Sequence, residues 1–223
     1  MKNNVYFIGA HPDDLIGAAA LFLELSRRPN DFNLHVIDFT RGELGLADRV
    51  TPEETARIRI AEEHQACALL GIEPIFLAEH DGESYAGREA CQALAAIFAR
   101  TPPRAVITHW PVDVHLDHVM CHAAVCRGLQ LAGQQPEMYF FEESIQTRSM
   151  PVRYYFPFPQ ELMDRKTELV RCYACQNGQD DMAERKILEA VYHGRQCGQP
   201  YAEPYGCALP HMAGSSTLFD LLV

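Results

Sequence analysis

Two short stretches of the sequence combine side chains that bind metal ions with side chains that move protons. The first is HPDD at residues 11–14, and the second is HLDH at residues 115–118. In each stretch the outer residues are three apart, so a turn or a helix start can bring both side chains to one face. Catalytic zinc sites take three ligands of these residue types and leave one position for water. The two stretches together predict a metal site with acid–base groups beside it.

The residue types suggest how the work would be divided at such a site. His11 and Asp14 would supply two ligands, and one histidine of the second stretch, either His115 or His118, would supply the third. Asp13 would then be free to act as a general base on a water molecule held by the metal. The other histidine of the second stretch would stabilise an oxyanion.

The elements that must position these residues alternate along the chain. Apolar, β-rich runs occur at 5–9, 34–39, 74–77, 104–108 and 138–141, and segments with helical spacing lie between them at 16–28, 52–70, 86–100 and 117–132. This alternation predicts an α/β fold with a mostly parallel sheet flanked by helices. Without an internal repeat or linker, residues 1–223 are expected to form a single domain. Both motifs directly follow a predicted strand, and ligands bind at the carboxyl ends of strands in such sheets.

Local signals mark the ends of one helix and the character of the C-terminal part. TPEET at 51–55 is typical of a helix start with Thr51 as N-cap, and Gly71 indicates the end of that helix. From about Pro157 onward we expect a helix-rich and then irregular segment. The YYFPFP stretch at 154–159 is interpreted as an aromatic turn.

Composition excludes several classes of protein. The net charge is −11 and the sequence pI about 5.3, which disfavours a nucleic-acid binder because such proteins carry a basic surface. Hydrophobic residues make up 48% of the chain, enough for a sizeable core. No apolar run approaches the roughly 18 residues of a membrane span, and the N-terminus does not resemble a secretory signal. A cytoplasmic location is therefore expected.

The eight cysteines are expected to be reduced thiols and not a disulfide framework. Four of them, Cys67, Cys91, Cys121 and Cys126, fall in predicted helices and are expected to be buried. The CxxC pair Cys172 and Cys175 lacks a second pair, so it is interpreted as buried thiols and not as a structural zinc site.

The two motifs resemble the signature motifs of the LmbE-like (PIG-L) zinc deacetylases. Further similar stretches are TRGELG (40–45), TPEETARIRIAEE (51–63), HDG (80–82), THWPVDVHLDH (108–118) and YAEPY (201–205). The resemblance covers nearly the whole chain. It implies a Rossmann-like α/β domain that hydrolyses the N-acetyl group of an N-acetylglucosamine-type conjugate, a small-molecule amino-sugar substrate.

Carried over by position, the resemblance assigns roles to the motif residues. His11, Asp14 and His118 would bind zinc, although iron(II) and cobalt(II) also suit these ligands. Asp13 would be the general base, and His115 would be the charged histidine that stabilises the tetrahedral intermediate.

The resemblance also implies contacts to the substrate and the possibility of assembly. Arg59 and Asp81 occupy the positions at which the family contacts the sugar, and Glu43 is a further candidate. Members of the family often form homo-oligomers, so one is possible here.

Two departures from the family pattern leave other functions open. The family usually has a glutamate just after HPDD, where this chain has Leu15, Ile16 and Gly17. It also often has a histidine followed by Ser-Gln, where this chain has CYACQNG (172–178) and keeps only the glutamine. The alternatives are a zinc amidase acting on a non-sugar amide such as a thiol conjugate, and a catalytically silent binding module.

Overall fold

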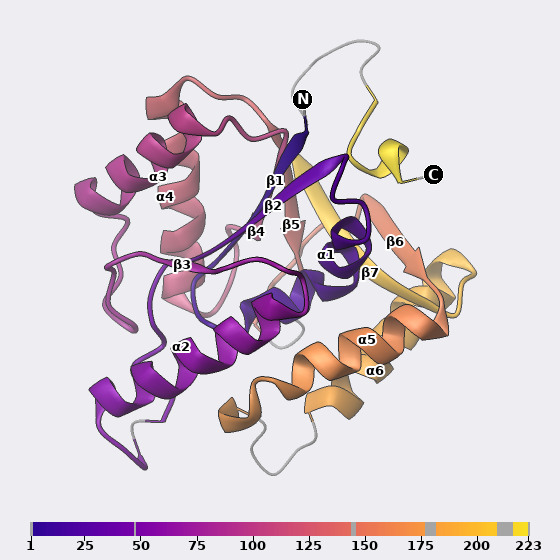
Figure 1. Ribbon diagram of the computed structural model, residues 1–223, viewed down its shortest axis with the longest axis horizontal. Coiled ribbons are helices and arrows are strands. Elements are labelled where there is room, and N and C mark those ends of the chain that lie inside the picture. Colours follow the sequence, from indigo (N-terminus) through magenta and orange to yellow (C-terminus); the bar gives the residue numbers. More distant parts are fainter. Residues whose placement is uncertain (1, 47, 144–145, 177–181, 209–215, 223) are drawn as a thin grey trace.

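The computed structural model describes residues 2–46, 48–143, 146–176, 182–208 and 216–222. Within this part, a seven-stranded sheet runs in the order β3-β2-β1-β4-β5-β7-β6 (Figure 1). Its strands are β1 (Asn3–Gly9), β2 (Phe32–Asp38), β3 (Ile75–Phe76), β4 (Ala105–His109), β5 (Glu137–Phe141), β6 (Tyr154–Phe158) and β7 (Tyr201–Ala208). The first five strands are parallel, and β7 is antiparallel to both of its neighbours. The predicted α/β class with a mostly parallel sheet is confirmed.

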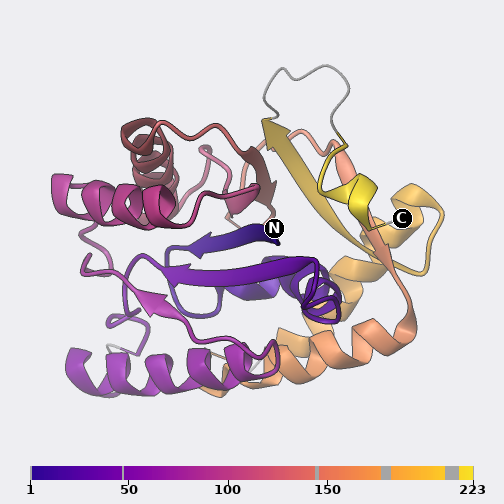
Figure 2. The ribbon, with the colours of Figure 1, turned by 45° about the horizontal axis from the view of Figure 1, so that its top comes forward.

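Helices cover both faces of the sheet (Figure 2). They are α1 (Ala19–Ser26), α2 (Pro52–Ala68), α3 (Arg88–Arg100), α4 (Leu116–Ala132), α5 (Gln160–Arg171) and α6 (Met182–Cys197). One core cluster packs α3 and α4 against the sheet through residues such as Phe98 and Val125. The other packs the remaining helices on the opposite face, around Phe7 and Phe22. The site lies between these layers, at the carboxyl edge of the strands.

The strand order places the two motifs side by side. The parallel strands follow the 3-2-1-4-5 order of Rossmann-like sheets, in which the chain reverses direction across the sheet between β1 and β4. Ligands bind in the crevice at this switch point. The HPDD motif follows β1 and the HLDH motif follows β4, so the two motifs flank the switch point.

The predicted boundaries of α2 are confirmed in detail. The hydroxyl of Thr51 accepts a hydrogen bond from the backbone N–H of Glu54 at 3.3 Å, and Pro52 is the first helical residue. Gly71 follows the helix with φ of +71°, a conformation that favours glycine. The helix predicted at 16–28 is confirmed for Ala19–Ser26, which form α1, and it is preceded by a 3-10 turn at Asp14–Ala18.

The prediction for the C-terminal part was wrong for two segments. YYFPFP is not a turn, because Tyr154–Phe158 forms the edge strand β6, and YAEPY lies in β7, between β5 and β6. Proline normally argues against an inner strand because it lacks a ladder N–H. Here the pairing of β7 with β5 covers only residues 205–208, so Pro204 lies beyond the last residue that pairs with β5.

The strand β7 also fixes the start of α1 through a buried glutamate. The carboxylate of Glu203 accepts hydrogen bonds from the backbone N–H groups of Ala20 at 2.7 Å and Leu21 at 3.0 Å. It also contacts Lys166 Nζ at 2.6 Å and accepts from the Tyr205 hydroxyl at 2.8 Å. The negative charge is thereby balanced both by a cation and by the N-terminus of the helix.

All eight cysteines lie in the described part and all are free thiols, as expected. Cys67, Cys91 and Cys121 are buried, but Cys126 is exposed, because it lies on the outer face of α4. Cys172 and Cys175 are half-buried. No helix in the described ranges is long and apolar enough to cross a membrane.

We expect the substitution Glu203→Ala to lower the free energy of unfolding by about 3–5 kcal/mol, because it leaves Lys166 buried and unpaired. Urea unfolding followed by circular dichroism measures the change. Glu54→Ala is the control, since Glu54 pairs with Arg57 on the exposed surface of α2, and its midpoint should match that of the wild type. Equal midpoints for both variants and the wild type would contradict this account of β7.

Candidate metal centre

A cavity of about 450 Å³ opens at the carboxyl edge of the sheet, and residues of both motifs line it. The loop after β1 contributes His11, Asp13 and Asp14, and the start of α4 contributes His115 and His118. The five motif residues predicted to act together therefore do lie together.

The carboxylate of Asp14 closes the loop after β1. Its Oδ2 atom accepts hydrogen bonds from the backbone N–H groups of Ala10 at 2.7 Å and His11 at 2.8 Å, and lies 3.0 Å from His109 Nε2 at the end of β4. The backbone passes so close that a Cβ atom on Gly9 would lie 2.8 Å from Asp14 Cβ. Glycine at position 9 is therefore required for this turn. With Oδ2 so engaged, Oδ1 is the oxygen that faces His118.

His11, Asp14 and His118 fit a metal ion. Their candidate ligand atoms all lie within 4.8 Å of one another, and all three side chains are buried. His11 Nδ1 is 3.8 Å from Asp14 Oδ2, and His118 Nε2 is 3.7 Å from Asp14 Oδ1. Two ligands at about 2.0–2.1 Å from one tetrahedral ion are about 3.3 Å apart. Both pairs are too distant for hydrogen bonds, and the distance from His118 Nε2 to Asp14 Oδ1 is close to the spacing that a shared ion imposes.

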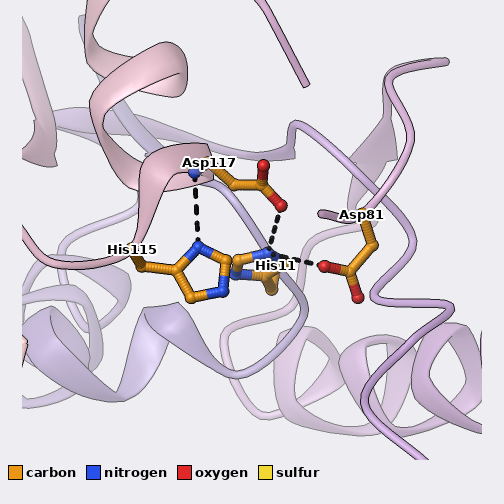
Figure 3. A group of neighbouring side chains, drawn as sticks. All are labelled: His11, Asp81, His115 and Asp117. Carbon is orange, nitrogen blue, oxygen red and sulfur yellow. Dashed lines mark hydrogen bonds and ion pairs between the residues drawn. The ribbon is translucent and has the colours of Figure 1, made fainter. Parts of the chain in front are cut away.

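The other ring nitrogen of His11 is held by two carboxylates (Figure 3). His11 Nε2 lies 3.1 Å from Asp117 Oδ2 and 3.2 Å from Asp81 Oδ1. Burial by itself would lower the pKa of His11, but these hydrogen bonds outweigh it and raise that pKa to about 10. Such a carboxylate contact fixes the ring and directs Nδ1 toward the metal position.

A second group of possible ligands, made of His11, Asp81, His115 and Asp117, is less suited to an ion. Asp117 already accepts hydrogen bonds from the N–H of Gly82 and the hydroxyl of Ser84, both at 2.6 Å. An ion there would need a free lone pair on His11 Nε2, the atom that donates to the carboxylates. The group therefore fits the role of orienting His11 better than that of binding metal.

Asp13 is held in a strained conformation with its carboxylate facing the cavity. Its φ of +105° lies in the left-handed region that non-glycine residues rarely adopt. Its N–H donates to Glu63 Oε2 at 3.3 Å, and its Oδ1 lies 2.7 Å from Arg59 Nη2. Burial raises the pKa of Asp13, and the charge of Arg59 opposes that shift.

Arg59 is almost fully enclosed by the protein. Its side chain is 5% exposed, and its guanidinium donates to the carbonyls of Pro12 and Gly42 as well as to Asp13. A Cβ atom on Gly42 would lie only 2.5 Å from Arg59 Nη1, so the loop after β2 makes room for the guanidinium by using glycine. Arg59, which was predicted to contact the sugar, does line the cavity, but its guanidinium already has partners within the protein.

His115 lies at the start of α4 with one ring nitrogen engaged. Its Nδ1 accepts a hydrogen bond from the N–H of Asp117 at 3.3 Å, so that nitrogen carries no proton. Burial, together with the neighbouring His11 and His118, lowers the pKa of His115 below its usual value. The hydrogen bond to Nδ1 leaves Nε2 as the ring nitrogen that can carry a proton into the cavity.

Of the other two residues predicted to contact the substrate, Asp81 lines the cavity and Glu43 does not. Asp81 lines the cavity, but both of its carboxylate oxygens have partners, since Oδ2 accepts from the N–H of Leu44 at 3.0 Å. Glu43 is not among the lining residues, and its carboxylate instead accepts from the N–H of Asp81 at 3.3 Å.

Three further residues at the site had no assigned role in the sequence predictions, and for His109 both a pocket role and a turn role had been left open. His109 holds Asp14, while Glu143 and Lys186 line the cavity. The strand-end rule signals two of them, because His109 ends β4 and Glu143 comes two residues after β5. Nothing in the local sequence marks Lys186, which lies within α6.

Comparison with known proteins places the chain in a family. The sequence profile of the PIG-L family, described as GlcNAc-PI de-N-acetylase, matches residues 6–128, more than half of the chain. A search of curated proteins found no match.

Solved structures share the fold at low sequence identity. The N,N'-diacetylchitobiose deacetylase of Pyrococcus horikoshii superposes with a TM-score of 0.79 at 21% identity, over 99% of this chain and 89% of that one. The 4-carboxy-2-hydroxymuconate hydratase of Pseudomonas putida gives a TM-score of 0.81 at 19% identity, over 97% and 100%. The zinc-inhibited form of a teicoplanin deacetylase gives 0.69 at 13% identity, over 92% and 99%.

The fold and the buried His–Asp–His group define an α/β protein with side chains that could hold a metal ion at the switch point of its sheet. The chain belongs to the PIG-L family, which places it among the de-N-acetylase hydrolases.

We expect the substitutions His118→Ala and Asp14→Ala to weaken zinc binding by about 100-fold or more, because each removes one of three protein ligands. Competition with a chromogenic chelator measures the affinity. His122→Ala is the matched control, since His122 lies one turn further along α4 and contacts the carbonyl of His109. Wild-type affinity in either ligand variant, or equal loss in the control, would contradict the assignment.

Proposed function

We propose that this protein is a zinc-dependent hydrolase that removes the N-acetyl group from an N-acetylglucosamine-type amino sugar or its conjugate. The observation that carries the proposal is the convergence of His11, Asp14 and His118 around one position, with Asp13 beside them in the cavity. Membership in the PIG-L family and the likeness to a chitobiose deacetylase support the choice of reaction. The expected homo-oligomer and cytoplasmic location stay predictions.

The residues of the chain supply the acid–base chemistry. Zinc, when bound by His11, Asp14 and His118, activates water and polarises the amide carbonyl. Asp13 accepts the proton of the attacking water and delivers it to the nitrogen of the departing amine, so that the C–N bond breaks to give acetate and a free amine. His115 donates a hydrogen bond from Nε2 to the oxyanion that develops on the carbonyl oxygen.

We further propose that Arg59 orients Asp13 and does not primarily bind the sugar. A carboxylate on a residue with a strained backbone needs partners that hold it there. Arg59 contacts both Asp13 Oδ1 and the carbonyl of Pro12, one residue earlier. The same cation thus fixes the backbone and the side chain of the proposed base.

A hydratase is the second candidate function, because the hydratase of Pseudomonas putida shares this fold closely. Addition of water to a carbon–carbon double bond also uses a base. Non-sugar amides such as thiol conjugates, and binding without catalysis, remain further alternatives. Acetate release from N-acetylglucosamine or N,N'-diacetylchitobiose by the zinc-loaded protein tests the proposal. Hydration of a carboxylated diene without any acetate release would favour the hydratase.

We expect the substitution Asp13→Asn to lower kcat for acetate release by about 10²–10⁴-fold, because the amide cannot accept the proton of water. Zinc affinity should stay within about twofold of the wild type, since Asp13 is not a proposed ligand. Steady-state kinetics and the chelator assay measure the two quantities. A fully active Asp13→Asn protein would rule out this residue as the base.

We expect the substitution Arg59→Lys to lower kcat by about 10²-fold with little change in KM, because a compact ammonium lacks the planar fork of the guanidinium that reaches Asp13 and two carbonyls at once, and Asp13 shifts. Kinetics on N-acetylglucosamine separate the two parameters. Arg57→Lys, on the exposed face of the same helix, is the matched control and should behave as the wild type. A rise in KM at constant kcat would instead show that Arg59 binds the sugar.

A further inference from the structure

Part of the cavity wall is built by the C-terminal half of the chain. Glu143 follows β5 and Lys186 lies on α6, and both line the cavity together with Gln146. These three residues lie outside residues 6–128, the part matched by the family profile. Family membership therefore gives them no role, while their position makes them neighbours of any molecule bound at the site.

Lys186 presents a buried ammonium group to this wall. Its side chain is 4% exposed, and its Nζ lies 3.0 Å from Glu189 Oε2 and 3.5 Å from Glu143 Oε1. A lysine offers three donors, and 3.5 Å exceeds the usual length of a strong hydrogen bond. The ammonium can therefore exchange its long contact with Glu143 for a shorter one to a ligand oxygen.

Glu143 presents an acceptor beside this donor. Its carboxylate can accept about four hydrogen bonds, and its side chain retains 18% exposure on the cavity wall. Burial raises the pKa of Glu143, with the charges of Asp14 and Asp13 adding to the shift and Lys186 opposing it. The charges of the site therefore act on the Glu143 carboxylate, and a hydrogen-bond donor on a bound ligand would stabilise its ionised form.

The charges of the wall favour a neutral ligand over an anion. Lys186 lies between two carboxylates, Glu143 and Glu189, and Arg59 is paired with Asp13. Arg185 also lines the cavity, and its Nε atom lies 4.0 Å from Glu189 Oε1. An anionic group placed against Lys186 would also meet the carboxylate of Glu143, and close like charges are unfavourable. A hydroxyl group can donate to a carboxylate and accept from an ammonium, so it suits both residues.

We propose that Glu143 and Lys186 form a subsite for adjacent hydroxyl groups on the substrate's sugar ring. One hydroxyl donates to the Glu143 carboxylate, and the oxygen of its neighbour accepts from Lys186 Nζ. This inference rests on the proposed function, because the sugar ring that the subsite would bind is the part of the substrate that remains after the acetyl group leaves. It also separates a sugar substrate from a non-sugar amide and from a carboxylated hydratase substrate.

Binding of two matched amides tests the subsite. The ligands are N-acetylglucosamine and N-cyclohexylacetamide, which has a six-membered carbocycle without hydroxyls. NMR titration of the zinc-loaded full chain gives their dissociation constants, with Asp13→Asn as the background so that the amides are not consumed. We expect Lys186→Met and Glu143→Gln each to weaken sugar binding about tenfold, which is about 1.4 kcal/mol at 25 °C. Binding of the cyclohexyl amide should change less than about twofold.

The control is another buried lysine that pairs with a carboxylate. Lys166 is also 4% exposed and contacts Glu203, but it is not among the residues that line the catalytic cavity. Lys166→Met should lower the free energy of unfolding without weakening sugar binding. Glu143→Gln, which nearly preserves shape, guards against a Lys186 variant that fails to fold.

Several outcomes would overturn the subsite. The substitutions could weaken binding of both amides equally, sugar binding could stay unchanged, or the Asp13→Asn protein with Glu143 and Lys186 intact could bind no sugar at all. Tighter binding of N-acetylglucosamine 6-phosphate, lost in Lys186→Met, would show an anion subsite instead. If the proposed function alone is wrong, the result is different. Sugar binding would still depend on Glu143 and Lys186, but the protein with intact Asp13 would release no acetate.

Discussion

The carboxylate of Asp14 connects three parts of the site through a few short contacts. Its Oδ2 atom accepts from two backbone N–H groups of its own loop and contacts His109 at the end of the neighbouring strand, which leaves Oδ1 facing His118. The turn requires glycine at position 9, and it places Asp13 in a left-handed conformation next to the cavity. Ligand position, base position and the join between β1 and β4 therefore depend on one side chain.

The tight loop explains why support for the site extends to distant residues. A strained base needs partners, and Arg59 and Glu63, both on α2, hold its side chain and its backbone. A histidine that binds a metal through one ring nitrogen is oriented by a hydrogen bond at the other nitrogen. Asp117 and Asp81 supply this contact at Nε2 of His11. These supports come from α2 on one face of the sheet, from α4 on the other face and from the loop after β3, so the site depends on elements from both faces.

Much of this arrangement could be predicted from the sequence, because parallel strands deliver their following residues to one edge. The five parallel strands, the helix start at Thr51 and the meeting of the two motifs were all predicted in this way. The two antiparallel strands were not, because Pro157 and Pro204 are tolerated only through a pairing pattern that local sequence does not show. The contacts of Arg59 with Asp13 and with the carbonyl of Gly42 also depend on atoms far away in the chain.

The central claim is that the metal binds to Nδ1 of His11 and leaves Nε2 to the carboxylates. Anomalous diffraction at the zinc edge, from crystals of the zinc-loaded protein, tests this most directly. The account predicts one strong peak at about 2.0–2.2 Å from His11 Nδ1, Asp14 Oδ1 and His118 Nε2. A peak among Asp81, His115 and Asp117, bonded to His11 Nε2, would contradict it and would assign the ligand role to the second group.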